Sequence, residues 1–115
     1  MNVLDLFSGC GGISLGFQLA GFNISGGIDI DEDSIKTFQK NFPKSKAICQ
    51  SLLEYSDQKI LDDFEKEKID VIVGGPPCQG FSSANRWNKE NEDPRNKLFF
   101  EYLRFVELLK PKAVV

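Results

Sequence analysis

One cysteine of this chain lies in a segment that fixes the direction of its side chain. Cys78 belongs to the stretch GGPPCQGFS, residues 74–82, which directly follows the apolar run DVIV. Two consecutive prolines restrict the backbone there and remove two hydrogen-bond donors, so the segment cannot continue as a helix. A cysteine can serve simply as a small apolar filler, but a rigidly presented thiol is what a nucleophile requires. The chain contains no histidine, so a cysteine–histidine dyad is excluded.

A glycine-rich loop is the second feature that could do chemistry. The stretch SGCGG, residues 8–12, follows the apolar run VLDLF. Glycines allow a sharp turn and let backbone N–H groups approach a ligand at the start of a helix, although an ordinary tight turn has the same composition. The dinucleotide fingerprint fails at its third glycine, where Ser14 stands, and no phosphate-loop lysine follows. The pattern therefore favours a nucleoside without phosphates.

An aspartate follows the second apolar run. Asp29 is expected at the end of a strand, where a carboxylate typically accepts hydrogen bonds from ribose hydroxyls. Asp31 and Asp33 are expected to cap the next helix, because carboxylates favour helix N-termini. Of the other two cysteines, we expect Cys49 to lie in the core on a third strand and Cys10 to contribute mainly its backbone.

Strand-like runs alternate with helical patterns along the whole sequence. Apolar runs predict strands at residues 3–7, 22–30, 46–49, 70–73 and 111–115. Apolar residues at helical spacing, with their stop signals, predict helices from residue 13 to Gly21, from Ile35 to Pro43, around residues 60–64 and over residues 98–109. A polar loop is expected at residues 83–96.

This alternation predicts an α/β fold, a doubly wound parallel sheet with helices on both faces. In the usual order for such a sheet the first and fourth strands are neighbours, and ligands bind where the winding reverses, at the carboxyl ends of the strands. That arrangement would bring SGCGG beside PPCQG. The sequence stops within the expected fifth strand, so we expect the front part of a larger domain.

Composition narrows the possible classes of protein. The 115 residues are 41% hydrophobic and 27% charged, which is typical of one globular domain. No apolar run approaches the roughly 18 residues of a membrane span, and the first residues, MNVLDLF, have neither the basic start nor the apolar region of a signal peptide, so we expect a cytoplasmic protein without membrane contact. Three cysteines without C-x-x-C spacing, and no histidine, argue against a disulfide framework and a metal site.

Charge is distributed unevenly along the chain. Residues 1–79 carry seven Lys and Arg against twelve Asp and Glu, a net charge of -5, whereas residues 80–115 carry seven against five, a net charge of +2. A protein that binds nucleic acid by itself usually has a basic face. If this chain meets nucleic acid, other protein should supply much of the contact.

The glycine loop DLFSGCGG, the acid after the second strand, GGPPCQGFS and then DPRNKLFFEYLRFV occur here in the order and spacing of one family. Across essentially all 115 residues the chain resembles the DNA cytosine-5 methyltransferases. The resemblance implies a Rossmann-like fold of the S-adenosylmethionine-dependent methyltransferase type, of which about five strands are present. It makes residues 1–115 the N-terminal part of the cofactor-binding catalytic domain, with the target-recognition domain absent.

The resemblance also assigns roles to residues. It implies S-adenosylmethionine as cofactor, with its methionine part near residues 7–12, its ribose on Asp29 and its adenine packed on Ile30. The implied cofactor residues are Phe7, Ser8, Gly9, Cys10, Gly11, Gly12, Asp29, Ile30, Ser51, Leu52, Pro76 and Leu98. The implied catalytic thiolate is Cys78, and the implied contacts to substrate DNA are Gln79, Gly80, Ser82, Arg86 and Arg95, with the loop at residues 83–96 closing over a flipped-out base. No metal is implied.

This sequence departs from the family pattern at two points. The family usually carries an acid after the third strand that binds the adenine amino group, whereas here Gln50, Ser51 and Leu52 follow, with Ser51 or Glu54 as substitutes. The Glu-Asn-Val segment, the target-recognition domain and the last helix of the family lie outside these residues, so we expect this chain alone to be inactive and to need a complementary C-terminal part. Two other functions stay open: an RNA cytosine-5 methyltransferase acting on transfer RNA, and a non-catalytic subunit that binds the cofactor or a partner.

Overall fold

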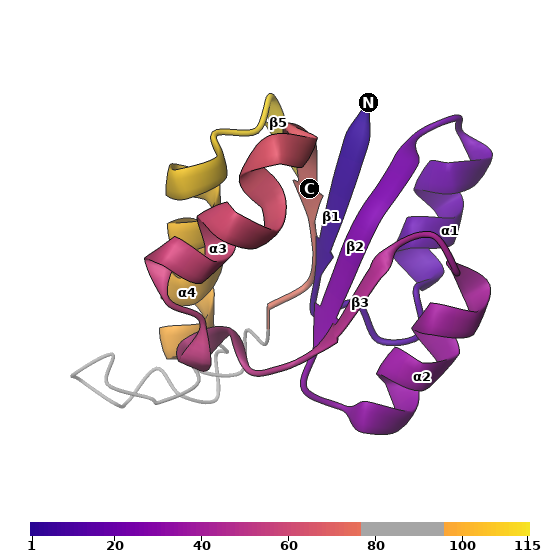
Figure 1. Ribbon diagram of the computed structural model, residues 1–115, viewed down its shortest axis with the longest axis horizontal. Helices are drawn as coiled ribbons and strands as arrows, with labels where there is room; N and C mark the ends of the chain where they lie inside the picture. The colour runs from indigo at the N-terminus through magenta and orange to yellow at the C-terminus, as the bar shows by residue number, and fades with distance from the viewer. Residues whose placement is uncertain (77–95) are drawn as a thin grey trace, which may run out of the picture.

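Among the described residues, a five-stranded parallel sheet forms the centre of the molecule, and helices cover both of its faces (Figure 1). The computed structural model describes residues 1–76 and 96–115. The strand order is β3-β2-β1-β4-β5, and every neighbouring pair is parallel. The sequence prediction that the first and fourth strands are neighbours is confirmed, and the winding reverses between them.

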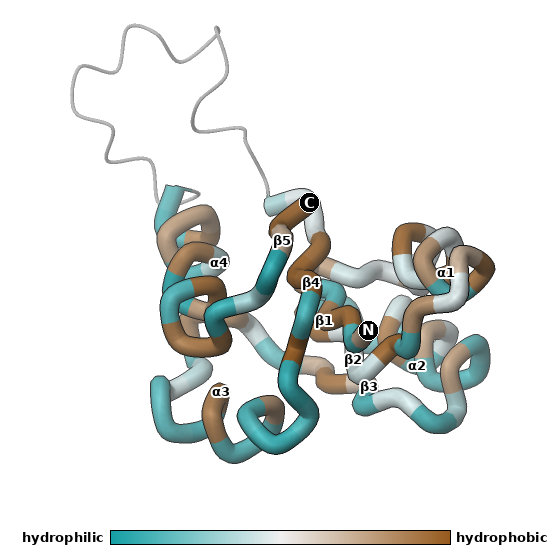
Figure 2. Tube along the Cα trace, turned by 90° about the horizontal axis from the view of Figure 1, so that it is seen from above, coloured by the Kyte–Doolittle hydropathy of each residue, from teal (hydrophilic) through white to brown (hydrophobic). Residues whose placement is uncertain are grey.

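The elements follow one another in regular alternation. The strands are β1 (Asn2–Leu6), β2 (Asn23–Asp29), β3 (Lys46–Cys49), β4 (Ile69–Val73) and β5 (Ala113–Val114). The helices are α1 (Gly12–Leu19), α2 (Glu32–Asn41), α3 (Asp57–Phe64) and α4 (Asn96–Leu109), with short 3-10 turns η1 (Leu52–Glu54) and η2 (Glu65–Glu67). Seen from above, α1 and α2 lie on one side of the strands, and α3 and α4 lie on the other (Figure 2). Of the helices that can be described, none has both the length and the hydropathy that a bilayer crossing requires.

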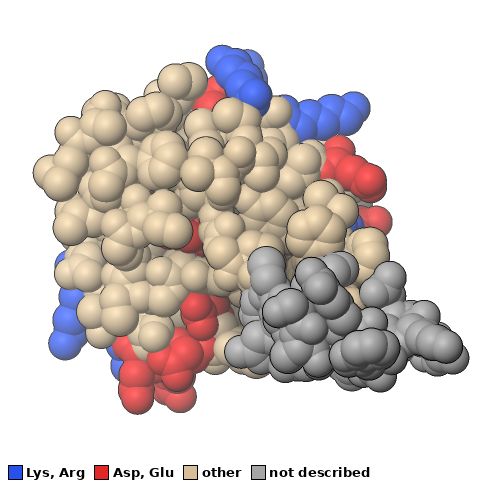
Figure 3. Space-filling model, turned by 180° about the vertical axis from the view of Figure 1, so that it is seen from behind, with Lys and Arg blue, Asp and Glu red and all other residues tan. Residues whose placement is uncertain are grey.

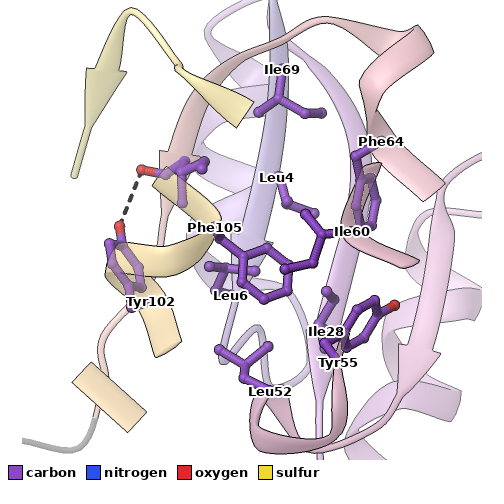
Figure 4. Packing of buried hydrophobic residues seen from close by; sticks show 11 residues of the cluster. Leu4, Leu6, Ile28, Leu52, Tyr55, Ile60, Phe64, Ile69, Tyr102 and Phe105 are labelled. Atoms are coloured by element: carbon purple, nitrogen blue, oxygen red, sulfur yellow. Dashed lines mark hydrogen bonds between the residues drawn. The ribbon is translucent and has the colours of Figure 1, made fainter. Parts of the chain in front are cut away.

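Two apolar clusters hold these three layers together. Between the sheet and the α1–α2 layer, Phe38 and Phe42 pack against residues of β1 and β4. On the other face, Phe105 of α4 points toward Leu4, Leu6 and Ile60 (Figure 4) and meets the ring of Tyr55 with centroids 5.4 Å apart. Burial of such side chains is the main favourable contribution to folding, about 1.5–3 kcal/mol for each.

Helix α4 is also tied to the sheet by a polar contact. The hydroxyl of buried Tyr102 shares its one proton between the carbonyl oxygens of Ile72 and Val115, each at 3.3 Å. Figure 4 draws the bond from Tyr102 to Ile72. Val115 in turn bonds to β4 through the backbone, since its N–H donates to Ile72 and its carbonyl accepts from Gly74. The short β5 is therefore fixed to β4 by backbone and side-chain hydrogen bonds together.

The capping predictions for Asp31 and Gly21 were confirmed, whereas Asp33 lies in the first turn of α2 and is not its cap. The prediction that Cys49 is buried in the core was wrong. Asp31 is the N-cap of α2, and its carboxylate accepts from the backbone N–H of Ser34 at 2.9 Å. Gly21 follows the end of α1 with φ 93°, the left-handed conformation in which glycine commonly ends helices. Cys49 is exposed rather than buried, because β3 is the outermost strand of the sheet and its thiol faces the carbonyl of Ile30 at 3.4 Å.

Strands β1 and β4 lie close together where they end. Gly74 follows β4 with φ 151°, and a Cβ atom there would lie 1.9 Å from the carbonyl oxygen of Leu6. Its neighbour Gly75 has nothing within 4 Å of the corresponding Cβ position. Gly74 therefore has no room for a side chain, whereas its neighbour Gly75 has.

We expect Gly74→Ala to destabilise the fold by about 3 kcal/mol or more, because it combines a strained φ with a collision against rigid backbone. Gly75→Ala is the matched control and should change stability by less than about 1 kcal/mol. Urea denaturation followed by circular dichroism measures both. Equal midpoints for the two variants would contradict the close approach.

Candidate cofactor site

A pocket of about 410 Å³ lies at the carboxyl ends of the strands. It is lined by residues that follow β1, β2, β3 and β4, together with Leu98 from the first turns of α4. This is the end of a doubly wound sheet where ligands bind. A second pocket, of about 430 Å³, lies beside Ile69 and Asp70 at the opposite end of the strands and contains none of the predicted site residues.

Asp29 joins three segments at this pocket. One carboxylate oxygen accepts from the N–H of Gly9 at 2.8 Å, and the other accepts from the N–H of Asp31 at 2.9 Å. The glycine loop after β1 and the start of α2 are thus held by the side chain that ends β2. Each carboxylate oxygen has about two acceptor sites, so one site on each oxygen remains for hydroxyl donors.

Most of the pocket wall is apolar. Phe7, Ile28, Ile30, Leu52, Leu53 and Leu98 contribute side chains to it. Ile30 is 72% exposed, an unusual fraction for a large apolar residue that follows a buried strand. Phe7 has φ 61°, a left-handed conformation that costs a residue with a side chain about 1–3 kcal/mol and is concentrated at functional sites. These walls suit a flat, largely apolar group such as a nucleobase.

Helices α3 and α4 hold the far wall in place. Arg104 of α4 donates to the carbonyl oxygen of Leu52 at 3.1 Å and forms an ion pair with Asp57 at 2.8 Å. Lys59 of α3 donates to the side-chain oxygen of Gln50 at 2.7 Å. The turn that carries Leu52 and Leu53 is therefore fixed by side chains from two helices.

The sequence-predicted cofactor residues are not all in this pocket. Phe7, Asp29, Ile30, Ser51, Leu52 and Leu98 line it. Cys10, Gly11 and Gly12 instead line a separate pocket of about 280 Å³ beside Asn41, whose side chain donates to the Cys10 carbonyl at 3.1 Å. Gly11 turns with φ 98° against α2, where a Cβ atom would lie 2.4 Å from the ring of Phe42.

The remaining predicted residues divide into two groups. Ser8 and Gly9 lie in the loop between β1 and α1, where Ser8 donates its N–H to the Ile28 carbonyl at 3.1 Å, and Pro76 follows β4. The predicted catalytic and DNA-contacting residues lie outside the described residues; they are Cys78, Gln79, Gly80, Ser82, Arg86 and Arg95.

Four lining residues were missed by the sequence analysis: Ile28, Gln50, Leu53 and Gly75. Gln50 and Leu53 are the sequence neighbours of Ser51 and Leu52, which were predicted, so this adjacency could have indicated them. Ile28 and Gly75 carried no chemical signal of their own, because one is an ordinary strand residue and the other a glycine. In the described part of the chain no group of three or more acidic or cysteine side chains is arranged to hold a metal ion.

A buried carboxyl group lies next to the site, in the middle of the sheet. Asp5 is fully buried between Gly27 of β2 and Val73 of β4, and one of its oxygens accepts from the hydroxyl of Ser14 in α1 at 2.6 Å. Its other oxygen has no hydrogen-bond partner among the residues that the structure describes. Burial raises the pKa of Asp5 from 3.8 to about 6, against the opposing effect of the Ser14 hydrogen bond.

Comparison with known proteins bears directly on this site. The family model described as C-5 cytosine-specific DNA methylase matches residues 1–115, the entire chain. The chain belongs to this family. The observed fold confirms the fold that the sequence resemblance implied.

Individual relatives are similar over the same residues. The chain is 43% identical over 116 residues to Type II methyltransferase M1.HphI of Haemophilus parahaemolyticus, covering 100% of this chain and 31% of the relative. It is 42% identical over 117 residues to Type II methyltransferase M.DdeI of Desulfomicrobium norvegicum, covering 100% of this chain and 27% of the relative.

A solved structure gives the same result. The crystal structure of a predicted DNA modification methyltransferase encoded within a prophage (E. coli) matches with a TM-score of 0.80 and 40% identity, over 96% of this chain and 30% of that one. This methylase-family chain thus spans about 30% of the length of the proteins it matches.

The raised pKa of Asp5 predicts a pH effect on stability. Between about pH 4 and pH 6 the Asp5 carboxyl keeps its proton in the folded protein but loses it in the unfolded chain. The stability that the protonated carboxyl contributes is therefore complete below pH 4 and is lost as the pH rises through 6. The shift from 3.8 to about 6 corresponds to about 3 kcal/mol. Asp5→Asn removes the titration, so its free energy of unfolding relative to the parent should rise by about that amount from pH 4 to pH 7. Urea denaturation at several pH values measures it, and a difference that stays constant across the range would contradict the assignment.

Proposed function

We propose that the pocket beside Asp29 binds S-adenosylmethionine and that this chain is part of an enzyme that methylates carbon 5 of cytosine in DNA. The observation that carries the proposal is an apolar pocket at the carboxyl ends of the strands with the carboxylate of Asp29 in its lining. Membership of the C-5 cytosine-specific DNA methylase family supports it.

The residues of the pocket fit the nucleoside part of this cofactor. Asp29 retains acceptor sites for the two ribose hydroxyls, because each of its oxygens receives one backbone N–H. Ile30 and Leu52 offer apolar faces to the base. The glycine loop, with Phe7, would meet the methionine part, and Pro76 and Leu98 would border it. When bound, S-adenosylmethionine supplies a methyl group on a positively charged sulfur.

Cys78 would supply the nucleophile. Its thiolate would add to carbon 6 of cytosine, forming the C6–S bond and making carbon 5 able to attack the methyl group as the methyl–sulfonium bond breaks. Removal of the carbon 5 proton then restores the ring double bond, and the C6–S bond breaks to release the thiolate. Covalent catalysis of this kind divides one difficult step into easier ones. The base must leave the duplex to reach the thiol.

Cys78 follows a pocket residue closely in the sequence. Gly75 lines the pocket, and Cys78 follows it by three residues. Consecutive Cα atoms are about 3.8 Å apart, so the two Cα atoms are separated by at most about 11 Å. A thiol within that distance can act on a base placed beside the methyl donor.

The face of the molecule seen from behind offers little basic area for DNA. No Lys, Arg, Asp or Glu occurs from Leu6 to Ile28, and the face seen from behind is mostly uncharged, with charged side chains toward its margins (Figure 3). Phosphate contacts by Lys and Arg supply much of the affinity of DNA-binding proteins. We therefore assign DNA binding to the loop at residues 83–96, with Arg86 and Arg95, and to the complementary part that the longer relatives carry. The 115 residues by themselves should be inactive, which a methyl-transfer assay on the isolated chain measures directly.

Covalent trapping tests the proposed chemistry. The chain is combined with its complementary C-terminal part, S-adenosylmethionine and DNA that contains 5-fluorocytosine. Fluorine replaces the carbon 5 proton and cannot be removed by a base, so the step that breaks the C6–S bond is blocked. The bond should therefore persist, and a protein–DNA complex should survive denaturing electrophoresis. Cys78→Ser should abolish the complex, whereas Cys10→Ser and Cys49→Ser serve as matched controls that keep it.

The outcomes separate the remaining alternatives. A complex that survives Cys78→Ser would show that Cys78 is not the nucleophile. A complex formed with 5-fluorocytosine RNA but not with DNA would identify an RNA methyltransferase. Binding of S-adenosylmethionine without any complex would favour a non-catalytic cofactor-binding subunit.

A further inference from the structure

The turn η1, which forms one wall of the pocket, has little stability of its own. It contains three residues, and short 3-10 turns have poorer hydrogen-bond geometry than α-helices. The N–H of Glu54 donates to the carbonyl of Ser51 at 3.1 Å, and the N–H of Tyr55 donates to the carbonyl of Leu52 at 3.3 Å, so its backbone bonds are local. Leu53 lines the pocket but is 50% exposed, so core packing does not fix it. The conformation of this wall therefore depends on contacts from outside the turn.

Arg104 of α4 supplies such a contact with a guanidinium group that joins three elements. One of its nitrogens donates to the carbonyl oxygen of Leu52 at 3.1 Å. The other two donate to Asp57 at the start of α3 at 2.8 Å and to Glu101 one turn earlier in α4 at 2.7 Å. With 24% of the side chain exposed, these bonds are largely shielded from water, which strengthens them. The two carboxylates hold the planar fork in the orientation that reaches Leu52.

We propose that Arg104 is a positioning residue for cofactor binding, which acts through the carbonyl of Leu52 to hold the pocket wall in its binding conformation. The inference rests on the proposed binding of S-adenosylmethionine. Arg104 does not line the pocket itself, so its effect on a ligand passes through the turn. When the binding-competent conformation is populated for only a fraction of the time, the apparent affinity falls by that fraction. Loss of Arg104 therefore weakens binding without removing a contact to the ligand.

The alternative is that Arg104 merely stabilises the packing of α4 against α3. That role belongs to the ion pair with Asp57, whereas the positioning role belongs to the bond with Leu52. Asp57→Asn separates the two, because it removes the ion pair and leaves the Leu52 carbonyl in place. The Asp57 side chain is 65% exposed, and ion pairs of exposed groups contribute little to stability.

Calorimetric titration of the 115-residue chain with S-adenosylhomocysteine tests the proposal. For Arg104→Met, which keeps an unbranched stem but has no donor, the dissociation constant should rise at least about tenfold, an effect typical of losing a hydrogen bond to a charged group. Asp57→Asn is the matched control and should stay within about threefold of the parent. Val3→Ala is the control for general destabilisation, because Val3 is fully buried on the opposite face of the sheet, and it should also stay within about threefold.

Hydrogen exchange of the Tyr55 N–H reports the turn directly, because this group donates to the same carbonyl as Arg104. Its exchange should be at least about tenfold faster in Arg104→Met and close to the parental rate in Val3→Ala, a difference that a general loss of stability would not produce. If circular dichroism shows that Arg104→Met does not fold, Arg104→Lys replaces it. A single ammonium group cannot hold three acceptors from three elements, so both changes should have the same direction.

The outcomes separate this inference from the proposed function. An unchanged dissociation constant in a folded Arg104 variant would overturn the inference and leave the proposed function intact. An equal loss of affinity in Val3→Ala or Asp57→Asn would overturn it as well, because the effect would then not depend on the Leu52 carbonyl. Failure of the parent chain to bind S-adenosylhomocysteine would overturn the proposed function, and this inference with it.

Discussion

Two hydrogen bonds to one carboxylate set the geometry on which the site depends. Asp29 ends β2, and its oxygens hold the N–H of Gly9 in the loop after β1 and the N–H of Asp31 at the start of α2. Because β1 is the central strand of the sheet, this link connects its loop to the neighbouring strand at the edge where ligands bind. Charge-assisted bonds of this kind are shorter and stronger than neutral ones. The same carboxylate therefore shapes the pocket and remains able to accept from a ligand.

The central position of β1 buries the carboxyl group of Asp5, which destabilises the folded state. Asp5 is fully buried in that strand with one oxygen unpaired, and burial raises its pKa to about 6. An unpaired buried acceptor typically costs about 1–3 kcal/mol. The other oxygen binds Ser14 of α1 and so fixes the helix that follows the glycine loop. Proteins retain such local conflicts mainly near functional sites.

The sequence predicted the sheet well because parallel strands buried on both faces are continuous apolar runs. The strand predicted at residues 46–49 is β3, but Cys49 is exposed there, because an apolar run does not reveal which strand forms the edge of the sheet. Glycines 11 and 12 line a pocket separate from the one beside Asp29, because Gly11 turns against Phe42 of α2; their contact with the cofactor stays a prediction. Which face of a loop meets a ligand depends on tertiary packing that local sequence does not encode. The prediction for Leu98 came from family resemblance alone, since nothing in helical periodicity indicates that one turn of α4 lines a pocket formed by four strands.

Helix α4 connects the segment proposed to bind DNA with the wall of the proposed cofactor pocket. It begins at Asn96, directly after the arginine assigned to DNA, and in its first turns it places Leu98 against the pocket. Two turns later Arg104 holds the carbonyl of Leu52, which fixes the turn that begins with Ser51 and Leu52. The same helix is anchored in the core by Phe105 and to β4 by the hydroxyl of Tyr102. A shift of α4 would therefore move the wall of the nucleoside pocket and the end of the segment that carries Cys78 together. The position of α4 therefore sets the position of this wall, because interior packing transmits displacement instead of absorbing it.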